Sequence, residues 1–93
     1  MDPEMETAYR GIVRTLVRYG GLSESEAQQR LSTSSVMDLD DDMARELFFH
    51  EEPYYWAMSI LYGKTDPNWY HDPARWPSPT DYYDPEWRKT WSE

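Results

Sequence analysis

The sequence predicts an all-α fold: a small bundle of four helices, two of them short, with an aromatic- and proline-rich C-terminal segment of short turns wrapped on it. Apolar residues recur at three- and four-residue steps up to Gly63, a pattern typical of helices that bury one face. Capping residues, glycines and a proline separate these periodic runs. The last thirty residues contain five of the seven prolines and four of the five tryptophans, which indicates short turns in place of a long helix.

One domain is expected from 93 residues, with a helical core at 1–63 and the C-terminal segment at 64–93 packed on it. The chain has no cysteine, so disulfides add nothing to its stability. Large aromatic side chains make up 16% of the residues, and we expect their burial to supply that stability.

The first helix is expected to begin at Pro3, because proline suits the first helical position and Asp2 can cap it. Gly20-Gly21 should end it, since glycine readily adopts the left-handed conformation of a helix stop. Gly11 in the middle of this helix is a small cost in helix propensity. The apolar stripe consists of Met5, Ala8, Tyr9, Ile12, Val13, Leu16 and Val17.

The second helix should begin at the capping box Ser23-Glu24-Ser25-Glu26, with Ala27 and Leu31 facing inward. The hydroxyl-rich run 32–35 should end it, because these side chains compete for backbone hydrogen bonds.

A third helix is expected to start within Asp38–Asp42, because acidic residues complement the positive end of the helix dipole. Pro53 should break this helix and begin a fourth one, which runs to about Tyr62 and stops at Gly63. The apolar face of the third helix is expected to be Met43, Ala44, Leu47 and Phe48. That of the fourth is expected to be Trp56, Ala57, Ile60 and Leu61.

The C-terminal segment repeats a short pattern in which Asp-Pro precedes a tryptophan by two or three residues. Aspartate can cap a helical turn whose first residue is proline, so we expect three single turns that each direct an indole toward the core. The three turns are Asp66-Pro67-Asn68-Trp69, Asp72-Pro73-Ala74-Arg75-Trp76 and Asp84-Pro85-Glu86-Trp87. Tyr82, Tyr83 and Trp91 are expected at the surface, because they lie nearest the end of the chain.

The net charge of −9 is concentrated in one stretch. Residues 38–52 carry seven acidic residues and one arginine, and therefore −6 of the total. Such a charge disfavours direct binding to nucleic acid, whose affinity depends on basic residues, and favours a basic protein surface. Arg10, Arg14 and Arg18 form a basic stripe on the first helix, which we expect to neutralise residues 38–52 within the molecule. The alternative is a contact with phosphate or an acidic partner.

The motifs of catalysis and of metal binding are incomplete. Asp38, Asp40 and Asp42 have the spacing of a calcium loop, but Met43 and Phe49 occupy the positions that require glycine and glutamate. His50 and His71 lack the spacing of a zinc site, and there is no nucleophile elbow or phosphate-binding glycine loop. We therefore expect no catalytic residue, cofactor or metal, and no membrane-spanning segment, which makes a cytoplasmic protein the default.

The function that these observations favour is a non-enzymatic acidic protein-binding module, a bacterial-type accessory, inhibitor or immunity protein. Its partner would be a protein with a basic surface, or a second copy of the chain in a homodimer. The alternatives are an inhibitor that mimics nucleic acid and a small metal-dependent enzyme. The candidate partner-binding residues are Asp38, Asp40, Asp41, Asp42, Glu46, Glu51, Glu52, Tyr82, Tyr83 and Trp91.

Overall fold

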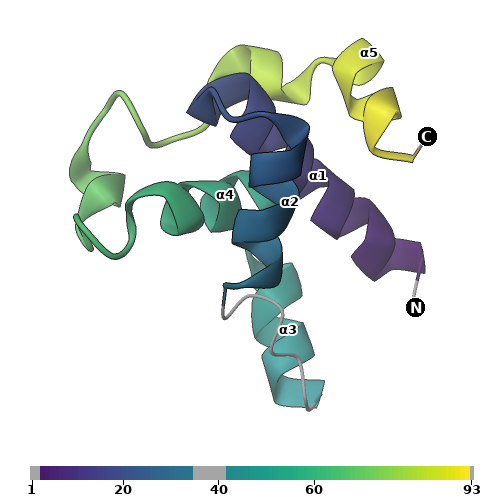
Figure 1. Cartoon of the computed structure of the whole chain (residues 1–93), viewed down its shortest axis with the longest axis horizontal. Helices are drawn as coiled ribbons and strands as arrows, with labels where there is room; N and C mark the ends of the chain where they lie inside the picture. Colours follow the sequence, from purple (N-terminus) through teal and green to yellow (C-terminus); the bar gives the residue numbers. More distant parts are fainter. Residues whose placement is uncertain (1–2, 35–41, 93) are drawn as a thin grey trace.

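Helices account for most of the residues that the computed structural model describes, which are 3–34 and 42–92, and these residues contain no strand (Figure 1). The all-α prediction is therefore confirmed. The α-helices are α1 (Pro3–Gly20), α2 (Glu24–Ser32), α3 (Asp42–His50), α4 (Pro53–Tyr62) and α5 (Pro85–Arg88). Single 3-10 turns are η2 (Trp69–His71), η3 (Thr80–Tyr83) and η4 (Lys89–Ser92).

α1 is the central element, and α2, α4 and η4 all pack against it. Of its predicted stripe, Ile12, Val13 and Leu16 are buried, the first and last of them fully, while Met5, Ala8, Tyr9 and Val17 are half-buried. Gly21 has a φ of 69°, so the left-handed stop predicted for this helix is confirmed. Gly11 is buried against the C-terminal segment, where an added Cβ would lie 2.7 Å from the Trp91 ring. Gly11 therefore allows the Trp91 ring to approach α1 closely. The sequence showed only the cost of this glycine in helix propensity.

α2 begins and ends where its hydroxyl groups predict. Ser23 Oγ accepts a hydrogen bond from the Glu26 N–H at 3.1 Å, and the Ser23 hydroxyl lies 3.1 Å from Glu26 Oε1. Ala27 and Leu31 are buried against the core. At the other end, the hydroxyls of residues 32–34 donate to the Gln29 and Leu31 carbonyls, which also accept backbone N–H groups of the last turn.

α3 extends away from the other helices as an arm (Figure 1). It is held at its C-terminal half by Phe48, whose ring stacks on Trp56 at 5.8 Å and contacts Tyr9 at 5.5 Å. The Trp56 indole N–H also donates to the Phe48 carbonyl at 2.9 Å. Glu52 is extended (φ −76°, ψ 159°) and precedes Pro53, so the chain changes direction between α3 and α4.

The predicted inward face of α3 is wrong for two of its four residues. Phe48 is 3% exposed and Ala44 is half-buried, but Met43 is 72% exposed and Leu47 is 62% exposed. Because the arm projects, α1, α2 and α4 pack together without covering these two side chains. The start of this helix was predicted within Asp38–Asp42, of which Asp42 is the first residue of α3 and residues 38–41 lie outside the described residues.

α4 has the predicted bounds, but the residues that it buries most deeply differ in part from the prediction. Tyr54, Ala57 and Met58 are buried, while Trp56, Ile60 and Leu61 are half-buried. The difference arises because the C-terminal segment covers a second side of α4, which a single periodic stripe does not anticipate. Its end also differs: Gly63 remains helical (φ −58°, ψ −31°), so a left-handed stop is absent at this residue.

The three Asp-Pro turns of the C-terminal segment are present, each capped by its aspartate. A carboxylate oxygen of Asp66, Asp72 and Asp84 accepts the backbone N–H two residues later, at 3.3, 2.9 and 3.1 Å respectively. Trp69 is 3% exposed, and Trp76 and Trp87 are half-buried against the core, so the predicted inward direction of these indoles is confirmed.

Tyr82 and Trp91 are core residues, and the prediction that they lie at the surface is wrong. Tyr82 is 0% exposed and Trp91 is 5% exposed. Position near the end of the chain misled the prediction, because η4 returns to α1 and places Trp91 over Gly11. Tyr83 is 54% exposed, as predicted.

Two of the three arginines of the α1 stripe, Arg14 and Arg18, pair with acidic residues other than those expected. Arg14 lies 3.9 Å from Glu24, and Arg18 lies 3.2 Å from Asp81, so these two pairs lie outside the stretch 38–52. The Arg18 guanidinium also stacks over the Trp87 ring at 4.7 Å, and Asp81 accepts a hydrogen bond from the Tyr19 hydroxyl at 2.7 Å. These contacts attach the C-terminal segment to the end of α1.

The Tyr19 hydroxyl makes stability depend on pH in the alkaline range. Burial, followed by the hydrogen bond to Asp81, raises the pKa of Tyr19 to about 12. The folded state therefore favours the neutral phenol, and this contribution to stability is complete below about pH 10, the value for an unfolded chain, and is lost as the pH rises toward 12. We expect Tyr19→Phe to weaken the dependence of the free energy of unfolding on pH above about pH 10. Urea denaturation at a series of alkaline pH values checks this, and parallel slopes in both proteins would contradict it.

Candidate protein-binding surface on α3

The exposed side of α3 carries acidic and apolar side chains in adjacent rows. Asp42 and Glu46 are four residues apart and therefore lie on one side of the helix, both exposed. Met43 and Leu47 form a second row with the same spacing. Phe49 (43% exposed) and His50 extend this surface toward the end of the helix. We call these six residues the α3 surface.

Packing on the opposite side of the helix determines which residues form the α3 surface. Phe48 is the residue of α3 that is buried, and Ala44 and Arg45, which precede it by four and three residues, are half-buried on the same side. Once the Phe48 ring is fixed between Tyr9 and Trp56, the other side of a helix of nine residues must face solvent.

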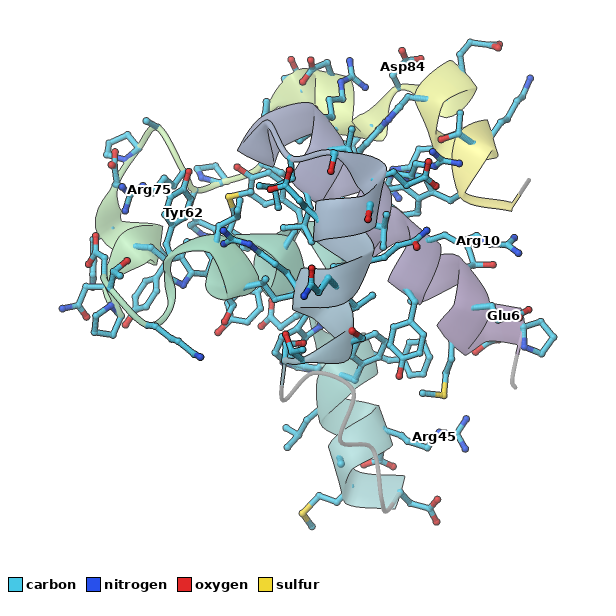
Figure 2. All side chains as sticks on the ribbon, viewed as in Figure 1. Glu6, Arg10, Arg45, Tyr62, Arg75 and Asp84 are labelled. Atoms are coloured by element: carbon cyan, nitrogen blue, oxygen red, sulfur yellow. The ribbon has the colours of Figure 1, made fainter. Side chains whose placement is uncertain are left out.

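A hollow separates α3 from the N-terminal end of α1. Figure 2 shows the Arg45 side chain leaving α3 toward the end of α1 that carries Glu6. Three carboxylates are present at this hollow, against one arginine, so its formal charge is negative. It is lined by Glu4, Asp42, Arg45, Glu46, Phe49 and His50.

The structure brings together two more of the predicted residues at the other end of α3. The Tyr83 hydroxyl donates to Glu52 Oε2 at 3.0 Å and lies 3.1 Å from Ser78 Oγ. Glu52 is exposed and Glu51 is half-buried beside it. This hydrogen bond joins η3 to the α3–α4 junction, so the exposed tyrosine and the acidic stretch are neighbours.

Two of the predicted site residues, Tyr82 and Trp91, are not part of this surface. Tyr82 and Trp91 lie in the core, where a partner cannot reach them without unfolding the C-terminal segment. Asp38, Asp40 and Asp41 lie outside the described residues.

Sequence reasoning assigned Met43 and Leu47 to the core and did not include Glu4 or Phe49. One signal could have identified the exposed apolar residues. Met43, Leu47, Phe48 and Phe49 occupy more of the helix circumference than one packed face can cover. An apolar excess in a short helix therefore indicates that part of it stays exposed.

The described residues contain no group of three or more histidine, cysteine, aspartate or glutamate side chains placed to hold a metal ion. Two other hollows contain a single carboxylate between them, that of Glu24. The first is lined by Arg30, Thr33, Ser34, Ser59, Ile60, Gly63 and Lys64, and the second by Tyr9, Arg10, Val13, Arg14, Glu24 and Gln28.

Among residues 3–34 and 42–92, every helix is too short or too polar to cross a lipid bilayer. No protein-family model, curated protein or solved structure matches the chain.

Proposed function

We propose that this chain is a non-enzymatic acidic binding protein of the accessory, inhibitor or immunity type, which binds a basic protein partner in the cytoplasm through the α3 surface. The observation that carries this proposal is the α3 arm itself. It extends from the packed helices and exposes Met43 (72%) and Leu47 (62%) beside two carboxylates. Clustered exposed apolar groups with a polar rim are typical of a protein-binding site.

The charge distribution supports a basic partner. Residues 38–52 carry −6 of the net charge of −9, and Asp42, Glu46 and Glu52 are exposed carboxylates of this stretch. A concentrated negative surface attracts a basic protein and accelerates the encounter, while it repels the phosphates of nucleic acid and a second copy of itself. A basic protein is therefore the partner class that the electrostatics favour.

The contact between Glu52 and Tyr83 supports the same surface. The Tyr83 hydroxyl holds the Glu52 carboxylate in one position at 3.0 Å, and the tyrosine ring remains 54% exposed beside it. A fixed carboxylate loses little conformational freedom when an arginine or lysine binds, and tyrosine contributes large contact area.

The test compares two variants that remove three charges each. The site variant is Asp42→Asn/Glu46→Gln/Glu52→Gln, and the control is Glu24→Gln/Glu26→Gln/Glu86→Gln, which removes exposed carboxylates from α2 and α5. Proteins that the wild type captures from a lysate are identified, and their association rates with the wild type, the site variant and the control are measured at low and high salt. We expect an association rate at least about tenfold lower for the site variant at low salt, and convergence of the three proteins at high salt.

A result against the proposal is equally specific. Association that is independent of salt, with equal rates for the site variant and the control, would show that the acidic surface does not guide binding. Displacement of the captured protein by duplex DNA would indicate instead that the surface mimics nucleic acid.

A further inference from the structure

Exposed apolar side chains are concentrated on α3. Five large hydrophobic residues are exposed in the part of the chain that the structure describes, and three of them, Met43, Leu47 and Phe49, belong to this single helix. The other two, Tyr70 and Tyr83, are tyrosines whose hydroxyls suit a solvent-facing position. The concentration of exposed apolar side chains on one projecting helix indicates that another molecule covers this part of α3.

The order of side chains around α3 restricts what that molecule can be. Successive helical residues are about 100° apart around the axis, so the row Met43–Leu47 lies beside the row Asp42–Glu46. Phe49 lies on the far side of the acidic row. A partner must therefore present an apolar stripe with basic groups along its edge, at the spacing of one helical turn.

Charge complementarity selects among the possible occupants. A homodimer through α3 would bring Asp42 and Glu46 of both copies into one interface, because a two-fold interface contains the same residues from each copy, and the α3 surface offers no lysine or arginine to pair with them. A membrane with anionic lipids would be repelled in the same way. An amphipathic helix with lysine or arginine beside its apolar stripe satisfies both rows, since its side chains recur at the same spacing as those of α3.

We infer that the α3 surface binds a basic amphipathic helix of the partner protein, which lies along α3 with its apolar residues on Met43 and Leu47. This inference rests on the proposed function and names the structure that the partner contributes. The basic groups of the partner helix lie along its edge, opposite the acidic row of Asp42 and Glu46.

The probe is a designed peptide of about 18 residues with leucine at helical spacing and lysine elsewhere, labelled with fluorescein. A peptide of identical composition in scrambled order has the same charge and no apolar stripe. Binding of both is measured by fluorescence anisotropy to the wild type, to Met43→Gln/Leu47→Gln, to the charge variant Asp42→Asn/Glu46→Gln/Glu52→Gln and to Tyr70→Gln. Glutamine preserves helix propensity, and Tyr70 is an exposed apolar residue away from α3, so Tyr70→Gln is the matched control.

We expect Met43→Gln/Leu47→Gln to weaken binding of the amphipathic peptide at least about tenfold, to leave the scrambled peptide unaffected, and Tyr70→Gln to bind like the wild type. Circular dichroism verifies that each variant is folded. Equal binding of the two peptides by the wild type, or unchanged binding by Met43→Gln/Leu47→Gln, would overturn the inference.

The same experiment separates the two proposals. If both peptides bind the wild type equally and lose affinity only in Asp42→Asn/Glu46→Gln/Glu52→Gln, the acidic surface is supported and the helix inference is overturned. If that charge variant binds both peptides like the wild type, the proposed function fails as well. Sedimentation that shows a wild-type dimer, abolished by Met43→Gln/Leu47→Gln, would mean that a second copy covers the face, which also overturns the inference.

Discussion

Replacing Tyr82 with alanine is expected to lower the free energy of unfolding by about 3–5 kcal/mol, the range for truncation of a large aromatic side chain in a core. Tyr82 is 0% exposed, and its ring contacts those of Tyr54, Trp87 and Trp91 at centroid distances of 5.3, 5.7 and 5.8 Å. Its hydroxyl accepts the Tyr54 N–H at 3.1 Å, a donor in the first turn of α4 that has no partner within the helix. One side chain therefore joins η3, α4, α5 and η4.

The expected loss is large relative to the total free energy of unfolding of the protein. A chain of this length has a free energy of unfolding of about 5–14 kcal/mol, so the loss could leave a large unfolded population. Urea denaturation followed by tryptophan fluorescence measures it, and Tyr82→Phe isolates the hydroxyl, with an expected loss of about 1–3 kcal/mol. Tyr83→Ala is the matched control at the exposed neighbour, where about 0.5 kcal/mol is expected. Similar losses at residues 82 and 83 would contradict the packing described.

Tyr82 also shows where the predictive value of the sequence ends. Tyr82 and Tyr83 are adjacent and chemically identical, yet one is fully buried and the other is 54% exposed. Their difference depends on how a 3-10 turn meets α4, a long-range contact that local sequence does not encode. By contrast, the bounds of α1 and α2 follow from Pro3, Gly21 and Ser23, because these residues act on backbone groups within one turn.

The candidate surface was predictable in its charge and unpredictable in its apolar part. The acidic excess at 38–52 is a property of composition, so the contribution of Asp42, Glu46 and Glu52 could be read directly. The exposure of Met43 and Leu47 could not, because periodicity assigns apolar residues to a core without showing how much core space remains. Indoles from the C-terminal segment already cover α4, and the arm has only Phe48 buried in the core.

Trp91→Ala is expected to cost about 3–5 kcal/mol, because the indole is 5% exposed and packs between α1 and the C-terminal rings. Its contact with α1 depends on Gly11. A Cβ added at residue 11 would lie 2.7 Å from Trp91 Cε3 and Cζ3, closer than carbon atoms can pack. Glycine in the middle of a helix normally costs about 1 kcal/mol relative to alanine, so this position trades helix propensity for close approach of the indole.

A double-mutant cycle at residues 11 and 91 tests this explanation, because the effect of Gly11→Ala on the free energy of unfolding should change sign when Trp91 is replaced. Gly11→Ala should destabilise the wild type by about 1–3 kcal/mol, because the methyl group displaces the indole. In the Trp91→Ala background the obstruction is absent, so the same substitution should stabilise the protein by about 1 kcal/mol through helix propensity. Urea denaturation of the four proteins gives the coupling energy. Equal stabilisation of both backgrounds by Gly11→Ala would mean that η4 does not pack on α1 as described. It would also mean that the C-terminal segment contributes less to the core than the burial of its rings indicates, since five of its aromatic residues from 69 to 91 are buried or half-buried.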